Sequence, residues 1–228
     1  MKKLLGIVVL GLLWRNVGLA QELIKIPVYI HILQIDEKRY KTKTKPKHID
    51  IHFRKANKIW AKANIFWDVK KIHYVPADTR NFESNVKWLR KHPINKKNAK
   101  KIDIIKRRAQ IQKQILQIEK HQEEGVINVY YIPYSHSGVC AYVHRYTKPV
   151  PRKEYLVMGH IINPKQRPRK YCKIQGIIMA HELGHMLYLN HIWKSGHLMG
   201  KYGGTRLPEE TVIEARENYK KYLKNYLK

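Results

Sequence analysis

Apolar and polar residues alternate over residues 24–33, which predicts a first β-strand with one buried face. Pro27 cannot donate a hydrogen bond to a neighbouring strand, so we expect the start of this strand at a sheet edge or a bulge. Apolar residues then recur at helical spacing from Ile51 to Ala63, and a second alternating segment runs from Ile65 to Val75. This part of the chain therefore predicts a strand, a helix and a strand in succession.

A strongly basic segment, residues 83–124, interrupts the alternation. A short helix around Trp88 is broken near Pro93, and a longer helix over residues 102–118 carries isoleucines among Lys, Arg and Gln. We interpret the segment as a helical hairpin inserted between two strands. Its pattern leaves two roles open: a solvated cover packed on the domain, or a docking arm for an anionic partner such as a membrane surface.

The rest of the chain predicts strands followed by helices. Apolar segments at residues 126–132, 139–144 and 155–162 are typical of short strands. An apolar helix is expected over residues 174–187. A last helix begins at Pro208, with acidic residues in its first turn and lysines near its end, which suits the helix dipole. The order of elements indicates an α+β fold.

Residues 1–20 have the pattern of a secretory signal peptide, in which Lys2 and Lys3 precede an apolar run over residues 4–14. The run is about half as long as a bilayer requires, so we expect cleavage and no transmembrane span afterwards. An uncleaved amino-terminal anchor is the alternative. Residues 21–228 can then form a single domain, which we expect to be secreted or periplasmic.

The charge is far from balanced. Lys and Arg number 46 against 17 acidic residues, giving a formal net charge of +29. Such a surface attracts lipid head groups, nucleic acid, glycans or acidic substrates, with an affinity that falls as salt rises. Charge alone does not choose among these partners, and a solvated surface with no specific partner is an equal alternative.

The two cysteines, Cys140 and Cys172, are an even number in a chain predicted to be exported, which favours one disulfide. Closing a loop of that length would stabilise the fold by roughly 3–4 kcal/mol on the chain-entropy model. Two free thiols are the alternative in a reducing compartment.

The strongest chemical signal lies in the predicted apolar helix, where His181 and His185 are four residues apart. Residues at this spacing share one face of a helix, so both imidazoles can bind one metal ion. Zinc in hydrolases usually takes three protein ligands, and His191 is the candidate for the third. A continuous helix would place residue 191 roughly 15 Å along the axis from residue 181. The chain must therefore turn back shortly after Leu187.

Glu182 projects about 100° around the helix from its histidine neighbour, beside the metal and not onto it. A carboxylate in that place can take a proton from a water molecule at the metal.

With Met199 further along, the pattern HExxHxxxxxH resembles the metzincin clan of zinc metallopeptidases, whose signature ends in a methionine within a tight turn. The resemblance implies a catalytic Zn²⁺, peptide or protein substrates, and a mixed twisted sheet with an antiparallel edge strand near residues 138–145. An extended peptide can add to such an edge beside the metal. The roles implied are metal ligand for His181, His185 and His191, general base for Glu182, and Met-turn methionine for Met199.

The chain departs from the clan at Tyr188, where metzincins have glycine. A non-glycine residue at positive φ costs about 1–2 kcal/mol, so either Tyr188 accepts this strain or Asn190 takes the turn. Tyr202 is a candidate for transition-state support, because some metzincins have a tyrosine two residues past the methionine. In this chain Lys201 has that place and Tyr202 comes one residue later, so an ordinary packing tyrosine is the alternative. His197 we interpret as a surface histidine. These residues assign no subfamily.

The function predicted is a secreted zinc endopeptidase in which Glu182 acts as general base. Two other classes stay open: a zinc amidase acting on a non-protein acyl amide, and a basic binding protein with a structural zinc. A gluzincin is the nearest competing ligand set, but it leaves His191 and Met199 without a role. Its third ligand would be Glu209, Glu210 or Glu214.

Overall fold

The structure is a computed structural model that describes residues 21–35, 44–78, 82–92, 102–132, 140–145, 149–159, 175–200 and 203–227. The predicted signal peptide, residues 1–20, lies outside these ranges, as do Cys172 and Tyr202. Cys140 is buried just before an edge strand and is not a free thiol. Because Cys172 is not among the described residues, the disulfide between the two cysteines stays a prediction.

Five strands form one mixed sheet in the order β2-β1-β3-β5-β4. The first four strands in that order run parallel, and β4 pairs antiparallel with β5 at the edge. The predicted mixed sheet with an antiparallel edge strand is therefore confirmed. The strands are β1 (Ile24–Gln34), β2 (Ile65–Pro76), β3 (Ile127–Ile132), β4 (Ala141–His144) and β5 (Tyr155–Gly159).

Strand β1 lies between β2 and β3, but the two pairings differ in length. It pairs with β2 from end to end, and with β3 only from Val28 onward. Its first residues, up to Pro27, thus have one neighbouring strand, and the register with β2 shifts between Val28 and Tyr29. Both features are what the missing N–H of Pro27 predicts.

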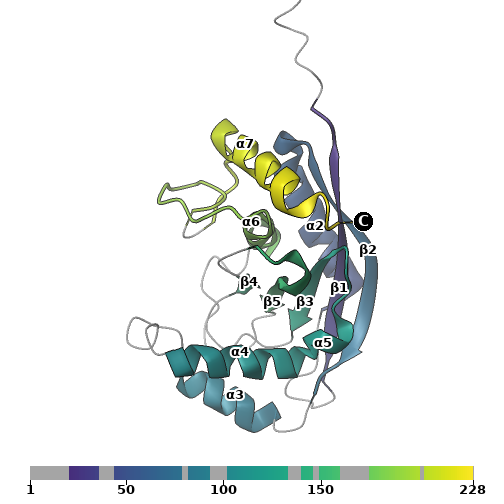
Figure 1. The fold of residues 1–228 in the computed structure, drawn as a ribbon, viewed down its shortest axis with the longest axis vertical. Helices are drawn as coiled ribbons and strands as arrows, with labels where there is room; N and C mark the ends of the chain where they lie inside the picture. The colour runs from purple at the N-terminus through teal and green to yellow at the C-terminus, as the bar shows by residue number, and fades with distance from the viewer. Residues whose placement is uncertain are drawn as a thin grey trace, which may run out of the picture.

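Helices cover both faces of the sheet (Figure 1). Helices α2 (Pro46–Trp60) and α6 (Gln175–Met186) pack on one face, against the side chains of alternate strand residues such as Ile30 and Val129. The intervening residues, such as Leu33 and Tyr130, form a second apolar cluster on the opposite face. Because side chains alternate along each strand, the sheet contributes to an apolar cluster on each face. Helix α6 packs in the larger of these two clusters.

Helix α2 and helix α6 are joined by a buried hydrogen bond in which Trp60 Nε1 donates to the Ala180 carbonyl at 3.1 Å. The buried face of α2 includes Phe53, Ala56 and Trp60. Ile51 does not belong to it, because its side chain is exposed. The predicted helix is present, but the assignment of Ile51 to its buried face is wrong.

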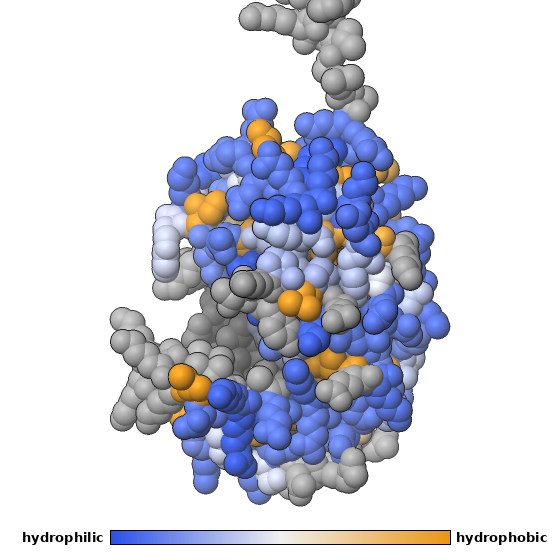
Figure 2. Space-filling view, in the orientation of Figure 1, coloured by the Kyte–Doolittle hydropathy of each residue, from blue (hydrophilic) through white to orange (hydrophobic). Residues whose placement is uncertain are grey.

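The described residues of the basic segment form the helices α3 (Phe82–Lys91), α4 (Ile102–Leu116) and α5 (Ile118–His121). Leu116 and Ile118 are buried in the second cluster with Tyr130 and Tyr155, so this end of the segment packs on the sheet. On the face that Figure 2 shows, the described surface is mainly hydrophilic. No helix in the described part of the chain combines the length and apolar character that crossing a bilayer requires.

A final helix α7 (Glu209–Asn218) continues as a π-helix, η5 (Tyr219–Leu223). Thr211, Val212 and Ala215 are buried on the side of the larger core. The acidic residues predicted for its first turn, Glu209 and Glu210, lie there and are exposed.

Candidate metal centre

The site begins where helix α6 ends. The helix stops at Met186, and Tyr188 has φ +59°, in the left-handed region. The turn is thus taken by Tyr188, at the glycine position of the signature, and not by Asn190. It reverses the chain so that His191 returns to the helix, as the spacing predicts.

The three predicted ligands converge on one point. His191 Nε2 lies 3.2 Å from His181 Nε2 and 3.1 Å from His185 Nε2. One ring nitrogen from each residue lies within 4.8 Å of the others, and in the described chain this is the group of His, Cys, Asp and Glu able to hold a metal. Tetrahedral zinc with Zn–N bonds of about 2.0–2.1 Å separates its nitrogen ligands by about 3.3 Å. The donor set fits zinc.

Backbone carbonyls orient two of these rings from behind. His181 Nδ1 donates to the Leu198 carbonyl at 2.6 Å, and His185 Nδ1 donates to the Leu189 carbonyl at 2.8 Å. With the proton on Nδ1, each Nε2 presents its lone pair to the site. Such contacts fix both the tautomer and the ring orientation of a metal-binding histidine.

Burial sets the charge of the site. It lowers the pKa of His185 to about 3, and it also lowers the pKa of His181 and His191. All three rings are therefore neutral near pH 7, which is the form that binds a metal. Glu182 is 8% exposed, and burial raises its pKa to about 8.

The triad implied by the metzincin resemblance is present in this chain. No protein-family model matches the sequence, and a search of curated proteins found no significant match. Among solved structures, the chain is similar to metalloproteinase-II from Bacteroides fragilis, with 11% identity and a TM-score of 0.46. That match covers 86% of this chain and 53% of the other, so the chain spans about half of that protein.

Two further structures are similar over almost their whole length. Archaemetzincin from Methanopyrus kandleri has 12% identity and a TM-score of 0.46, covering 86% of this chain and 96% of the other. Mirolysin in complex with compound 9 has 13% identity and a TM-score of 0.49, covering 86% and 91%.

The predicted Met-turn methionine, Met199, is fully buried below the triad's helix. A methyl group at Gly184, between the two helical histidines, would overlap the Met199 sulfur and crowd Trp60. A larger residue here would therefore force the Met199 side chain to shift. The Met199 carbonyl accepts a hydrogen bond from the N–H of Ile192 at 2.9 Å, which ties the turn to the residue after His191.

His197 is buried, so its interpretation as a surface histidine is wrong. Its Nδ1 accepts the N–H of Met199 at 3.0 Å, and its Nε2 donates to Thr211 Oγ1 on α7 at 3.1 Å. The ring thus links the Met-turn to the last helix. The polar, glycine-containing neighbourhood of His197 suggested a surface loop, and the sequence carries no local signal for the contact with Thr211.

Tyr188 is held in its unusual conformation by buried contacts. Its hydroxyl donates to Glu154 Oε2 at 2.5 Å, and its ring packs on Tyr222 with centroids 4.9 Å apart. Burial, together with the Glu154 carboxylate, raises the pKa of the Tyr188 hydroxyl. Behind the same turn, Asn218 Nδ2 donates to the Leu187 carbonyl at 3.0 Å. These contacts offset the strain of the left-handed residue.

Replacing Tyr188 by phenylalanine is expected to lower the free energy of unfolding by about 1–3 kcal/mol, because the buried Glu154 carboxylate loses its donor. Denaturant unfolding of the metal-free protein measures this loss. Tyr222→Phe, which keeps the ring packing against Tyr188, is the matched control. Equal stability of Tyr188→Phe and the wild type would show that the hydrogen bond contributes nothing.

Arg145, which follows β4, is a residue of the site that sequence reasoning missed. Its Nη1 donates to the carbonyls of His185 and Leu189 at 3.5 and 3.4 Å, and its Nη2 donates to Asn190 Oδ1 at 2.8 Å. A cation at the end of helix α6 also suits the helix dipole. The competing carboxylates of a gluzincin set lie on α7 and do not belong to the triad's cluster.

Proposed function

We propose that this chain is a secreted, zinc-dependent endopeptidase with Glu182 as its general base. The observation that supports this best is the convergence of the Nε2 atoms of His181, His185 and His191 at the spacing of a tetrahedral zinc site. Metal-assisted peptide hydrolysis needs such a site next to a proton acceptor, and Glu182 follows the first histidine on the same helix.

Zinc, when bound, supplies a Lewis acid that activates water and polarises the scissile carbonyl. Burial raises the pKa of Glu182 in the metal-free site, and a cation held by the three histidines would lower it again, so that the carboxylate is ionised and can accept the proton of the attacking water. The same carboxyl would later deliver that proton to the leaving amine. Because Glu182 is buried, bulk water does not compete with the attacking water for its carboxylate. The three histidines are neutral and free to bind a metal, because burial lowers the pKa of each ring.

The sheet supplies the orientation of the substrate. Among the strands that the structure describes, β4 is the edge strand of the sheet and pairs with β5, and an extended peptide can add to a sheet at such an edge. Arg145 joins the end of this strand to the turn between His185 and His191. A peptide added to β4 would therefore pass beside the triad. This arrangement favours cleavage within a chain, as in an endopeptidase.

We place the protein in a secreted or periplasmic compartment on the pattern of residues 1–20. Amino-terminal sequencing of exported protein would test this part of the proposal, with a new terminus at Gln21 as the expected result.

Metal removal tests the chemistry. Dialysis against a chelator is expected to abolish cleavage of a broad peptide library, and one equivalent of Zn²⁺ per chain should restore it. Metal analysis of the purified protein should give one zinc per chain before chelation. Cleavage that persists without metal would end the proposal. Zinc binding with hydrolysis of acyl amides but not peptides would favour the amidase.

A further inference from the structure

We infer that the substrates are acidic peptides and that Arg145 is the residue that selects them. This inference rests on the proposed peptidase function and names the substrate class of the same site. Arg145 is a cation at the rim of the triad whose contacts leave part of its guanidinium open for a ligand.

Within the described residues, the contacts of Arg145 are with neutral acceptors. They comprise two long hydrogen bonds to carbonyl oxygens and one to an amide oxygen, all from Nη1 and Nη2. A guanidinium carries five N–H donors in a planar fork, so Nε and further N–H groups remain for a ligand. The ion pairs of the described chain, Arg54 with Asp50 and Lys70 with Asp68, do not include Arg145.

Arg145 lies directly against the turn that joins two of the metal histidines. It donates to the carbonyl of His185 itself and to the Asn190 side chain, one residue before His191. The carboxylate that contacts the same turn belongs to Glu154, which is 2% exposed and accepts hydrogen bonds from Tyr188 and the Val150 N–H. Glu154 is therefore committed to the interior, while Arg145 is partly exposed.

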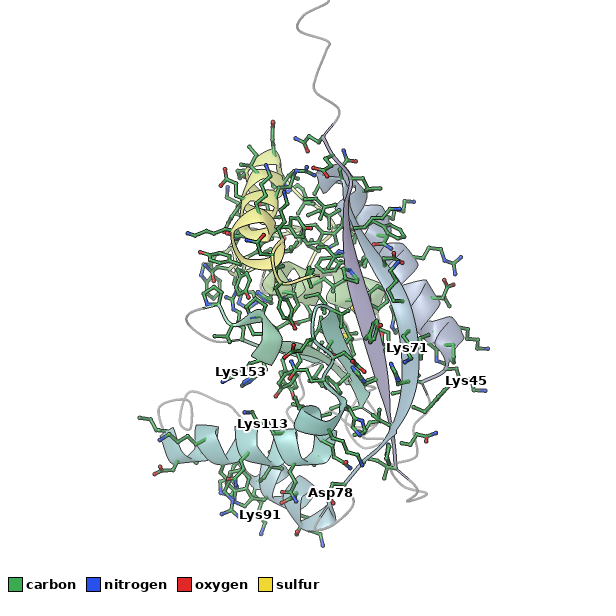
Figure 3. The ribbon with its side chains drawn as sticks, turned by 45° about the vertical axis from the view of Figure 1, so that its right-hand side comes forward. Lys45, Lys71, Asp78, Lys91, Lys113 and Lys153 are labelled. Atoms are coloured by element: carbon green, nitrogen blue, oxygen red, sulfur yellow. The ribbon has the colours of Figure 1, made fainter. Side chains whose placement is uncertain are left out.

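Lysines extend this positive charge along the edge strand. Lys113 of α4 contributes to the lowered pKa of His144, the last residue of β4. Figure 3 shows Lys113 on the side of α4 that faces the body of the domain, and Lys153 on that body opposite it. Both lysines are exposed. A peptide added to β4 would thus meet Lys113 near the strand and Arg145 at its end.

The chemistry of this edge fits a carboxylate better than a neutral side chain. An aspartate or glutamate beside the scissile bond can accept two parallel hydrogen bonds from the Arg145 fork, and such charge-assisted pairs are about twice as strong as neutral ones. The surrounding lysines, with a chain net charge of +29, would speed the encounter with acidic peptides at low salt.

Pairs of matched peptides test the inference. The two peptides of a pair differ only in having glutamate or glutamine at one position, and that position is varied around the cleaved bond. At one position at least, the wild type should cleave the glutamate peptide with a kcat/KM about tenfold or more above its glutamine twin. Arg145→Gln, which can still donate to Asn190, should lose this preference and retain zinc. Arg54→Gln removes an equal charge from the outside of α2 and should keep the preference.

Equal cleavage of the twin peptides by the wild type would overturn the inference. So would an Arg145→Gln variant that loses the same factor on both twins, because Arg145 would then only position the turn. Calorimetric binding of the twins to Glu182→Gln makes the comparison without turnover. Tighter binding of the glutamate peptide together with no cleavage by the wild type would support the acidic subsite and end the peptidase proposal.

Discussion

Replacing Glu182 by glutamine is expected to lower kcat/KM for peptide cleavage by about 10²–10⁴-fold while zinc content stays at one per chain. Glutamine has the shape of glutamate but cannot accept the proton of the attacking water. Because Glu182 is almost fully buried, neither bulk water nor a surface side chain can replace it. Steady-state kinetics and metal analysis on the same preparation measure both quantities.

Glu214→Gln is the matched control, because Glu214 is an exposed carboxylate on α7. It should keep the activity and the metal. Full activity in Glu182→Gln would remove the general base from the mechanism. Loss of zinc from that variant would instead assign Glu182 to the metal's own ligands.

Replacing His191 by alanine is expected to weaken zinc binding by more than about 100-fold and to abolish turnover at limiting zinc. Loss of a group that merely supports a ligand costs about 10–100-fold in metal affinity, and loss of the ligand itself should cost more. His181 and His185 would remain on the helix with two nitrogens, which do not complete a zinc site. Titration against a chelator of known affinity measures the change.

Glu210→Ala is the control for this variant, because Glu210 is one of the carboxylates that a gluzincin ligand set would use. It should bind zinc as the wild type does. Unchanged affinity in His191→Ala together with a loss in Glu210→Ala would reverse the assignment of the third ligand.

The sequence predicts those parts of the structure that depend on short-range spacing. The four-residue interval between His181 and His185 places both side chains on one face of the helix. Because His191 must reach the same metal, the number of residues before it requires the helix to end near Leu187. The alternation in β1 follows from the two-residue period of a strand, and the irregular pairing near Pro27 follows from its missing N–H. Each of these features is set by residues close to one another along the chain.

The contacts that support the site could not be predicted in this way. Tyr188 meets Glu154 from 34 positions away, and Arg145 meets Asn190 from 45 positions away. Such pairs leave no periodic signal, since only the packing of β4, β5 and α6 brings them together. His197 was misassigned for the same reason, because its partner Thr211 lies on a separate helix.

The turn that returns His191 to the triad packs against the last helical segment. The Tyr222 ring contacts the Tyr188 ring, and the Asn218 side chain donates a hydrogen bond to the Leu187 carbonyl. During synthesis these supports emerge from the ribosome after the entire triad has done so. The three imidazoles are therefore held in register only when residues 218–222 are docked, and firm binding of zinc is expected to depend on that docking. Metal acquisition is in this sense a late step of maturation.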